Sequence, residues 1–172
     1  GNSFDTNILE IAFSNVIFKA NAPTQIAITG AICELFINDI PKQCWQTHNV
    51  KAGDIIKIGK ILKGIRVYLG VFGGFDIKKE FGSNSTTIKE NLGGLYGDKL
   101  KKGDILAFNE FSCSFDTRFK KELIPSYEDE LILRVVLSYQ SDLFANKEKK
   151  KFFSNSFTVS NDFNRMGCKL NG

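Results

Sequence analysis

Short apolar runs rich in β-branched and aromatic residues recur along the chain, and clusters of Gly, Asn, Asp and Pro separate them. The runs cover residues 8–18, 25–29, 55–61, 65–72, 131–136 and 157–159. Short strands bounded by turn residues in this way are typical of a β-sandwich or β-barrel. The pattern therefore predicts a mainly β fold.

Helical spacing is confined to two short stretches. Residues 141–153 place Leu143, Phe144, Lys147 and Phe152 at imperfect helical spacing, with Ser141 as a candidate N-cap. Residues 86–92 allow barely two turns of helix. Between the β-prone runs, residues 115–129 mix charges with a proline and are expected to form a surface loop.

Two segments repeat the same local pattern. Residues 50–56 read VKAGDII and residues 100–106 read LKKGDIL, so that a Gly-Asp pair leads each time into two apolar residues. This chemistry reverses the chain and starts a strand. Two copies are too few for a stacked repeat protein, and we interpret both as turns.

Composition and charge narrow the class of protein. A length of 172 residues with 42% hydrophobic and 24% charged residues suits one folded domain with its own core. The net charge of +4 comes from 23 basic and 19 acidic residues, a balance that does not favour nucleic-acid binding. No apolar run approaches the roughly 20 residues that cross a bilayer, so we expect a cytoplasmic protein.

Cysteine and histidine spacing gives no metal site. The four cysteines are too scattered for a CxxC pair, and His48 is the only histidine. We expect the cysteines to be reduced. Because no cysteine or serine near His48 forms a nucleophile motif, we interpret this residue as packed at a strand end.

A glycine-rich stretch, residues 64–87, is the best candidate for chemistry. It has neither the order of a P-loop nor a GxGxxG motif. Gly73, Gly74 and Asp76 follow a predicted strand, and the run Gly82-Ser83-Asn84-Ser85-Thr86 comes next. Glycine lets a backbone approach a ligand, and successive N–H groups followed by hydroxyls can hold an anion.

The same stretch can also be explained by a purely structural role, without any ligand. From the residues alone we favour this structural role over anion binding. Gly73 and Gly74 would relieve a crowded barrel corner, and Ser85 would cap the short helix. Towards the chain end, Arg165 lies in a polar turn, where its guanidinium could grip a carboxylate or phosphate, although a surface ion pair is the commoner role of such an arginine.

Taken in order, several motifs resemble one known family. They are IAITGA, Trp45 followed by VKAGDIIKIG, GIRVYLGVFGGFDIKKEFGSNST, NLGGLYGDKLKKGDIL, LRVVLSYQSDLF and FTVSNDFNRMGCKLNG. The chain resembles the KipA family, also called the allophanate hydrolase subunit 2 or biotin-dependent carboxyltransferase family. The resemblance implies a cyclophilin-like β-barrel with one or two short helices. It also implies the C subunit of an ATP-dependent 5-oxoprolinase, which opens the lactam of 5-oxoproline to glutamate, or the related urea carboxylase carboxyltransferase.

The resemblance also implies the site. Contacts to substrate or phosphate are expected from Gly82, Ser83, Asn84, Ser85, Thr86 and Arg165, supported by Gly73, Gly74, Asp76, Gln140 and Asp142. Asn84 stands where the family has the arginine of GSRST. Gln140 and Asp142 keep part of a GPQxD motif. No residue stands out as general base or nucleophile, so the catalytic residues stay unassigned.

Cofactors and partners follow from the same resemblance. ATP is the expected cofactor, and biotin would come only from a partner chain, because an MKM-like lysine motif is absent. A KipI-like subunit and a LamB/YcsF-like subunit are the expected partners. We expect residues 1–172 to form one carboxyltransferase-like domain that is truncated at both ends relative to the family. Two alternatives are a regulatory binding module that captures a KipI-like kinase inhibitor without catalysis, and an inactive remnant.

Overall fold

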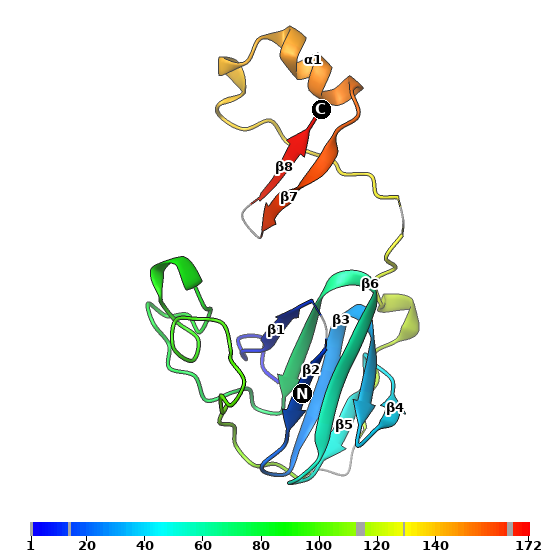
Figure 1. Ribbon diagram of the computed structural model, residues 1–172, viewed down its shortest axis with the longest axis vertical. Helices are drawn as coiled ribbons and strands as arrows, with labels where there is room; N and C mark the ends of the chain where they lie inside the picture. The colour runs from blue at the N-terminus through cyan, green and yellow to red at the C-terminus, as the bar shows by residue number, and fades with distance from the viewer. Residues whose placement is uncertain (1, 14, 113–115, 129, 165–166) are drawn as a thin grey trace. The chain divides into compact units, whose positions relative to one another are not determined.

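The computed structural model describes residues 2–13, 15–112, 116–128, 130–164 and 167–172 (Figure 1). The chain divides into two compact units, Gly1–Tyr127 and Glu128–Gly172. We call them the first and second unit and describe each by itself. The expectation of one domain over residues 1–172 stays a prediction.

An antiparallel sheet of six strands forms the first unit (Figure 1). Its strands are β1 (Leu9–Ala12), β2 (Val16–Lys19), β3 (Thr24–Ile37), β4 (Ile40–Lys42), β5 (Thr47–Val50) and β6 (Ile55–Val71). The long strands β3 and β6 pair with each other at the centre. On the outer side of β6 lie β1 and β2, and on the outer side of β3 lie β4 and β5. The mainly β prediction is confirmed.

The expected barrel differs from the structure. Among the described residues, strand pairing runs from β1 and β2 through β6 and β3 to β4 and β5, and it does not return to β1 or β2. Closing a barrel requires every strand to have a partner on both sides. The outer strands, of three or four residues each, are paired on one side only, so the sheet stays open.

Strand boundaries differ from the predicted runs for local reasons. The run 8–18 is split into β1 and β2 because Phe13 (φ 58°) and Asn15 (φ 67°) adopt left-handed backbone. The runs 55–61 and 65–72 instead join into the single strand β6. Run 25–29 lies inside β3, whose pairing with β6 shifts register three times between Gly30 and Leu35. Such bulges bend a strand.

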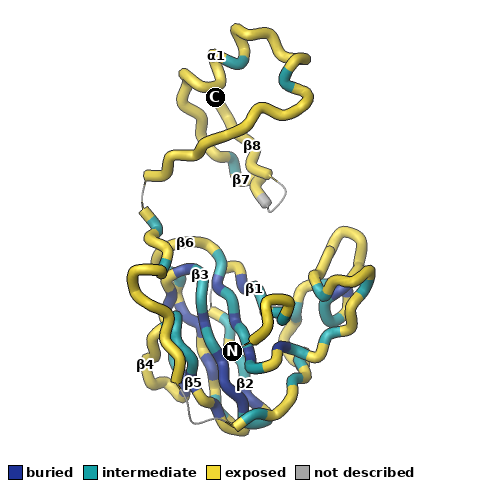
Figure 2. Tube along the Cα trace, turned by 180° about the vertical axis from the view of Figure 1, so that it is seen from behind, coloured by how far each residue is buried: buried dark blue, intermediate teal, exposed yellow. Residues whose placement is uncertain are grey.

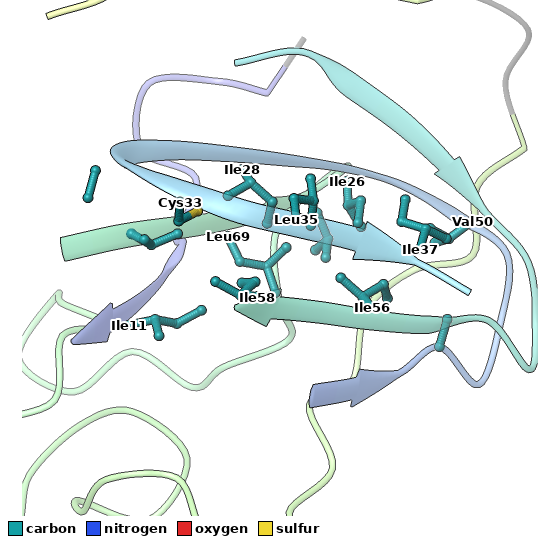
Figure 3. Packing of buried hydrophobic residues seen from close by; sticks show 14 residues of the cluster. Ile11, Ile26, Ile28, Cys33, Leu35, Ile37, Val50, Ile56, Ile58 and Leu69 are labelled. Carbon is teal, nitrogen blue, oxygen red and sulfur yellow. The ribbon is translucent and has the colours of Figure 1, made fainter. Parts of the chain in front are cut away.

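Alternating side chains of the sheet build the core (Figures 2 and 3). In β6, Ile56 and Ile58 alternate with exposed residues. Ile28, Leu35, Ile58 and Val67 are the largest fully buried side chains in the described residues. Burying a side chain of this size contributes about 1.5–3 kcal/mol. The core of the first unit therefore lies along the β3–β6 pair.

The two Gly-Asp segments form the same turn, as predicted. The Asp54 carboxylate accepts the Lys51 N–H at 2.7 Å, and the Asp54 N–H donates to the Lys51 carbonyl at 3.1 Å. Asp104 and Lys101 repeat both contacts at 2.7 and 3.1 Å. Only the first turn leads into a strand, β6.

The second unit contains a short helix and a two-stranded hairpin. Its elements are the 3₁₀ turn η3 (Ser141–Leu143), the helix α1 (Asn146–Ser154) and the antiparallel strands β7 (Thr158–Asn164) and β8 (Gly167–Asn171). The helix predicted over residues 141–153 is thus realised as η3 and α1. The run 157–159 lies at the start of β7. Two further 3₁₀ turns, η1 (Ile88–Glu90) and η2 (Lys121–Leu123), belong to the first unit.

The strand predicted over residues 131–136 is wrong. No strand is assigned to this run, although it keeps its β-prone, apolar composition. A strand exists through hydrogen bonds to a neighbouring strand. Within the described residues this run has no such pairing, so the composition alone does not produce the element.

Among the described residues, no helix combines the length and the apolar character needed to cross a bilayer.

Candidate functional site

The glycine-rich stretch forms a long excursion from the end of β6, drawn in green in Figure 1. We call residues 72–108 the glycine-rich lobe. Its base is closed by an antiparallel bridge between Phe75 and Phe108, and the Asp76 N–H donates to the Ala107 carbonyl at 2.8 Å. The two ends of the lobe are therefore held together by paired backbone.

Two asparagines of the amino-terminal segment fix the start of the lobe. The Asn7 side chain accepts the Phe75 N–H at 2.7 Å and donates to the Phe75 carbonyl at 2.9 Å. The Asn2 side chain accepts the Gly73 N–H at 2.8 Å. These bonds tie the first residues of the chain to the root of the lobe.

Gly74 is the crowded position at this corner. Its φ is 82°, and an added Cβ would lie 2.6 Å from Thr6 Cγ2 and 2.9 Å from Asn7 Oδ1. Gly73 has open space around it. The space-saving role expected of both glycines therefore applies to Gly74, and the crowding comes from the amino-terminal segment.

A tight hairpin turn introduces the predicted binding loop. Glu80 and Ser83 exchange both backbone hydrogen bonds, at 2.8 and 3.0 Å. Between them Phe81 (φ 51°) and Gly82 (φ 80°) are both left-handed, which is the pattern of a type I′ turn. Phe81 is 95% exposed at its tip.

Internal hydrogen bonds hold the loop itself, residues 82–86. The Asn84 side chain turns inward and donates to the Ile77 carbonyl at 2.6 Å. The Ser85 N–H donates to Ser83 Oγ at 3.1 Å. The Asn84 carbonyl accepts the Gly94 N–H at 3.2 Å. These hydrogen bonds fix the shape of the loop and use part of its donor capacity.

A second glycine segment backs this loop. The Gly93 N–H donates to the Glu80 carboxylate at 2.7 Å, and the Gly97 N–H donates to the Gly93 carbonyl at 2.8 Å. A Cβ on Gly93 would overlap the Ser85 carbonyl oxygen. The close approach of two backbone segments requires glycine at this position.

Three residues of the loop carry hydroxyl groups, and the Thr86 hydroxyl faces Gly94, where an added Cβ would overlap Thr86 Oγ1. Ser83, Ser85 and Thr86 are all exposed. Ser85 does not cap the short helix, because Thr87 precedes η1 and makes no side-chain cap bond. The structure thus brings the predicted hydroxyls together on one ordered segment, in the same lobe as the exposed Asp76 at its root.

The lobe carries one close ion pair. Lys101 Nζ lies 2.8 Å from the Asp98 carboxylate. This contact, aided by the Lys99 N–H, lowers the pKa of Asp98, and it raises the pKa of Lys101. Both side chains stay charged over the physiological pH range.

The other predicted site residues lie elsewhere. Arg165 falls outside the described residues. Gln140 and Asp142 belong to the second unit, at the turn that opens η3, and both are exposed. Their part in a common site with the loop stays a prediction.

Histidine and metal chemistry do not add to the site. His48 in β5 is 8% exposed, and its Nε2 lies 2.7 Å from the Gln43 carbonyl, so the interpretation as a packed residue is confirmed. Searched over the residues that the structure describes, no cluster of three His, Cys, Asp or Glu side chains could hold a metal ion.

Sequence reasoning missed two features of the lobe. The Glu80 carboxylate accepts the N–H of Gly93, which lies 13 residues further along the chain, so local spacing gave no signal for this contact. The left-handed Phe81 was also missed, because an aromatic residue rarely takes this conformation.

Comparison with known proteins places the whole chain in one family. The family model described as "Carboxyltransferase domain, subdomain A and B" matches residues 1–172. The chain is 33% identical to the urea amidolyase of Saccharomyces cerevisiae over 183 residues, which cover all of this chain and 10% of that protein. It is 29% identical to the 5-oxoprolinase C subunit of Escherichia coli over 173 residues, which cover all of this chain and 54% of that protein.

A solved structure agrees with the sequence matches. The crystal structure of the K. lactis urea amidolyase superimposes on the whole chain with a TM-score of 0.80 at 29% identity, over 11% of its own length. The chain thus spans about a tenth of the urea amidolyases and about half of the 5-oxoprolinase subunit that it matches. The family indicated by the sequence motifs is confirmed: the chain belongs to the carboxyltransferase domain family, subdomains A and B.

Proposed function

We propose that this chain is the carboxyltransferase-type part of a non-autonomous subunit in an ATP-dependent complex that opens a cyclic amide, with 5-oxoproline as the substrate and glutamate as the product. The observation that carries the proposal is the match of the entire chain to the C subunits of two bacterial 5-oxoprolinases. The related role, in a urea carboxylase, is supported by the matches to urea amidolyases.

The loop 82–86 would act through electrostatics. The exposed residues Ser83 and Ser85 carry hydroxyl donors on a hydrogen-bonded segment, and Thr86, whose hydroxyl faces Gly94, completes the proposed set. Donors that are fixed before the reaction stabilise the negative charge that develops on a carbonyl or phosphoryl oxygen. Arg165, which the resemblance matches to the arginine of an SDRMG motif, would add a cationic contact of its own, and the arginine of GSRST is replaced by Asn84. No residue is proposed as general base or nucleophile.

The hydrogen-bond donors of the loop decide which anion it can hold. The Ser83 N–H is bonded to the Glu80 carbonyl and the Ser85 N–H to Ser83 Oγ, so the loop offers hydroxyl donors in place of a run of backbone N–H groups. This set suits one oxyanion better than a triphosphate. We therefore propose that ATP is used by the assembled complex, with KipI-like and LamB/YcsF-like subunits, in the cytoplasm. Biotin would enter only on a partner chain.

Release of ADP by the assembled complex tests the proposal. We expect 5-oxoproline to stimulate ADP release when the complete subunit that contains this chain is mixed with its KipI-like and LamB/YcsF-like partners. Replacing Ser85 with alanine should lower the stimulated kcat by about 10- to 100-fold, because one preorganised donor is lost. The backbone bond from Ser85 to Ser83 survives this change.

The matched control is Thr87→Ala, which removes a neighbouring exposed hydroxyl outside the loop. We expect this variant to keep the stimulated rate. Equal losses in both variants, or no response to 5-oxoproline in the intact complex, would contradict the proposed role of the loop.

A second candidate function is a regulatory module that binds a KipI-like kinase inhibitor. Phe81 at the hairpin tip is 95% exposed and Tyr96 on the same lobe is 76% exposed, and exposed aromatic side chains often anchor protein partners. This function requires that Phe81→Ala weakens binding of the KipI-like protein, while 5-oxoproline leaves ADP release unchanged in every mixture.

A further inference from the structure

Two cysteines that precede the glycine-rich lobe in the sequence lie in direct contact with each other. Cys33 belongs to β3, and Cys44 lies between β4 and β5. Their Sγ atoms are 3.6 Å apart, and Cys44 Sγ also lies 3.7 Å from the Cys33 carbonyl oxygen. Both are free thiols. Because a disulfide bond is about 2.05 Å long, the sulfurs need to approach by only about 1.5 Å to bond.

The two thiols differ in their surroundings. Cys33 is 9% exposed within the core shown in Figure 3, whereas Cys44 is half-buried. The hydrogen bond between the two thiols lowers the pKa of Cys44, and the same contact, together with burial, raises the pKa of Cys33. The thiolate is the reactive form of cysteine. Cys44 is therefore suited to react first and Cys33 to react second.

We propose that Cys33 and Cys44 form a reversible oxidation site that reacts with hydroperoxides. In the first step the Cys44 thiolate attacks the peroxide, so that an S–O bond forms, the O–O bond breaks and the alkoxide or hydroxide leaves with a proton from solvent. In the second step Cys33 Sγ attacks Cys44 Sγ. The S–S bond forms, the S–O bond breaks and water leaves, with the Cys33 proton. The two thiols supply the two electrons that reduce the peroxide.

The chain around Cys44 would transmit this change. Trp45 has a left-handed backbone (φ 62°), and its N–H donates to the Ile28 carbonyl at 2.7 Å. Its carbonyl accepts the Phe119 N–H at 2.8 Å, and the two rings lie 5.4 Å apart. The buried Trp45 Nε1 has no hydrogen-bond partner among the described residues. Movement of Cys44 therefore changes the environment of Trp45.

Trp45 is the chain's single tryptophan and gives a direct signal for the reaction. The test is performed on the folded chain carrying Cys168→Ser, which removes an exposed thiol and leaves three. Hydrogen peroxide should lower the thiol count from three to one, and the intact mass should fall by that of two hydrogen atoms. Peptide mapping should join Cys33 to Cys44. Trp45 fluorescence should change at the same rate, and dithiothreitol should reverse both signals.

Two further variants separate the steps. Cys33→Ser removes the second thiol, and we expect a sulfenic acid on Cys44 that dimedone traps. Cys44→Ser should abolish both the disulfide and the fluorescence change, with circular dichroism as the check on folding. A mapped disulfide that joins other cysteines, or an unchanged thiol count at peroxide concentrations that oxidise Cys168 in the unsubstituted chain, would overturn the proposal.

Discussion

The two units use similar apolar sequences in opposite ways. In the first unit fourteen hydrophobic residues of the described chain are buried around the β3–β6 pair. In the second unit none of the described residues is buried, although Ile132 and Val136 are as apolar as any core residue and are 94% and 95% exposed (Figure 2). Apolar composition is therefore not sufficient for burial. The first unit buries its apolar side chains because its long strands β3 and β6 pair with each other in the sheet.

The contrast bears on the proposed function. Apolar side chains and strand-like segments that have no partner within their own unit favour association with other protein surfaces. A second unit without a core of its own suits a subunit that works inside a complex or a longer protein, as proposed for this chain. The loop 82–86, by contrast, belongs to the unit that has a core.

The largest difference is expected from side-chain truncation. Ile58→Ala in the first unit removes a fully buried side chain and should lower the free energy of unfolding by about 2–5 kcal/mol. The matched change Val136→Ala in the second unit should alter it by less than about 0.5 kcal/mol, because the second unit does not bury this side chain. Urea denaturation followed by Trp45 fluorescence measures the free energy of unfolding of Ile58→Ala. Urea denaturation followed by circular dichroism of the whole chain measures it for both variants. A comparable loss at Val136 would contradict the contrast.

A backbone comparison should give a smaller effect. Gly30 has φ 87°, and an added Cβ would lie 2.5 Å from the Arg66 carbonyl oxygen, whereas a Cβ on Gly167 in β8 would meet nothing within 4 Å. Gly30→Ala should cost about 1–3 kcal/mol of stability from backbone strain alone. Gly167→Ala should be nearly neutral. Thermal unfolding of both variants tests this difference, which fails if their midpoints shift equally.

The smallest expected effect is electrostatic. Asn38 donates to the Asp54 carboxylate at 2.8 Å, and this bond, with the Lys51 N–H, lowers the pKa of Asp54 from 3.8. A lowered pKa in the folded state adds stability above about pH 4, and this stability is lost as pH falls through the folded value. Asp54→Asn should cost less than about 1 kcal/mol at pH 7, because water screens the group, and the cost should shrink as pH falls below about 4 towards pH 2.

The comparison residue for this effect is Asp162 in the second unit, whose carboxylate lies 3.6 Å from Lys169 with both side chains exposed. Asp162→Asn should leave stability unchanged at both pH values. A loss at Asp54 that is the same at pH 2 and pH 7 would show that the carboxylate charge is not its source.

The sequence predicted the first unit better than the second for a physical reason. The runs 55–61 and 131–136 both have the composition of a strand, yet only the first pairs. Pairing depends on residues distant in the chain, which composition does not reveal. The Gly-Asp turns were predicted correctly because turn chemistry is local.

The candidate site shows the same division. The hydroxyl residues of the loop 82–86 could be anticipated from the sequence. The inward turn of Asn84 to the Ile77 carbonyl could not, because it depends on how the lobe folds back on itself. The contact of Cys33 with Cys44 likewise depends on how the sheet folds, because the two residues are not at CxxC spacing and the sequence therefore did not predict it.

Hydrogen exchange of the whole chain, resolved by mass spectrometry, tests most directly the claim that only the first unit has a core. Amides in β3 and β6 should exchange through global unfolding, and those of β7, β8 and residues 131–136 should exchange at rates close to those of an unfolded chain. Protection of residues 131–136 equal to that of β6 would contradict the claim.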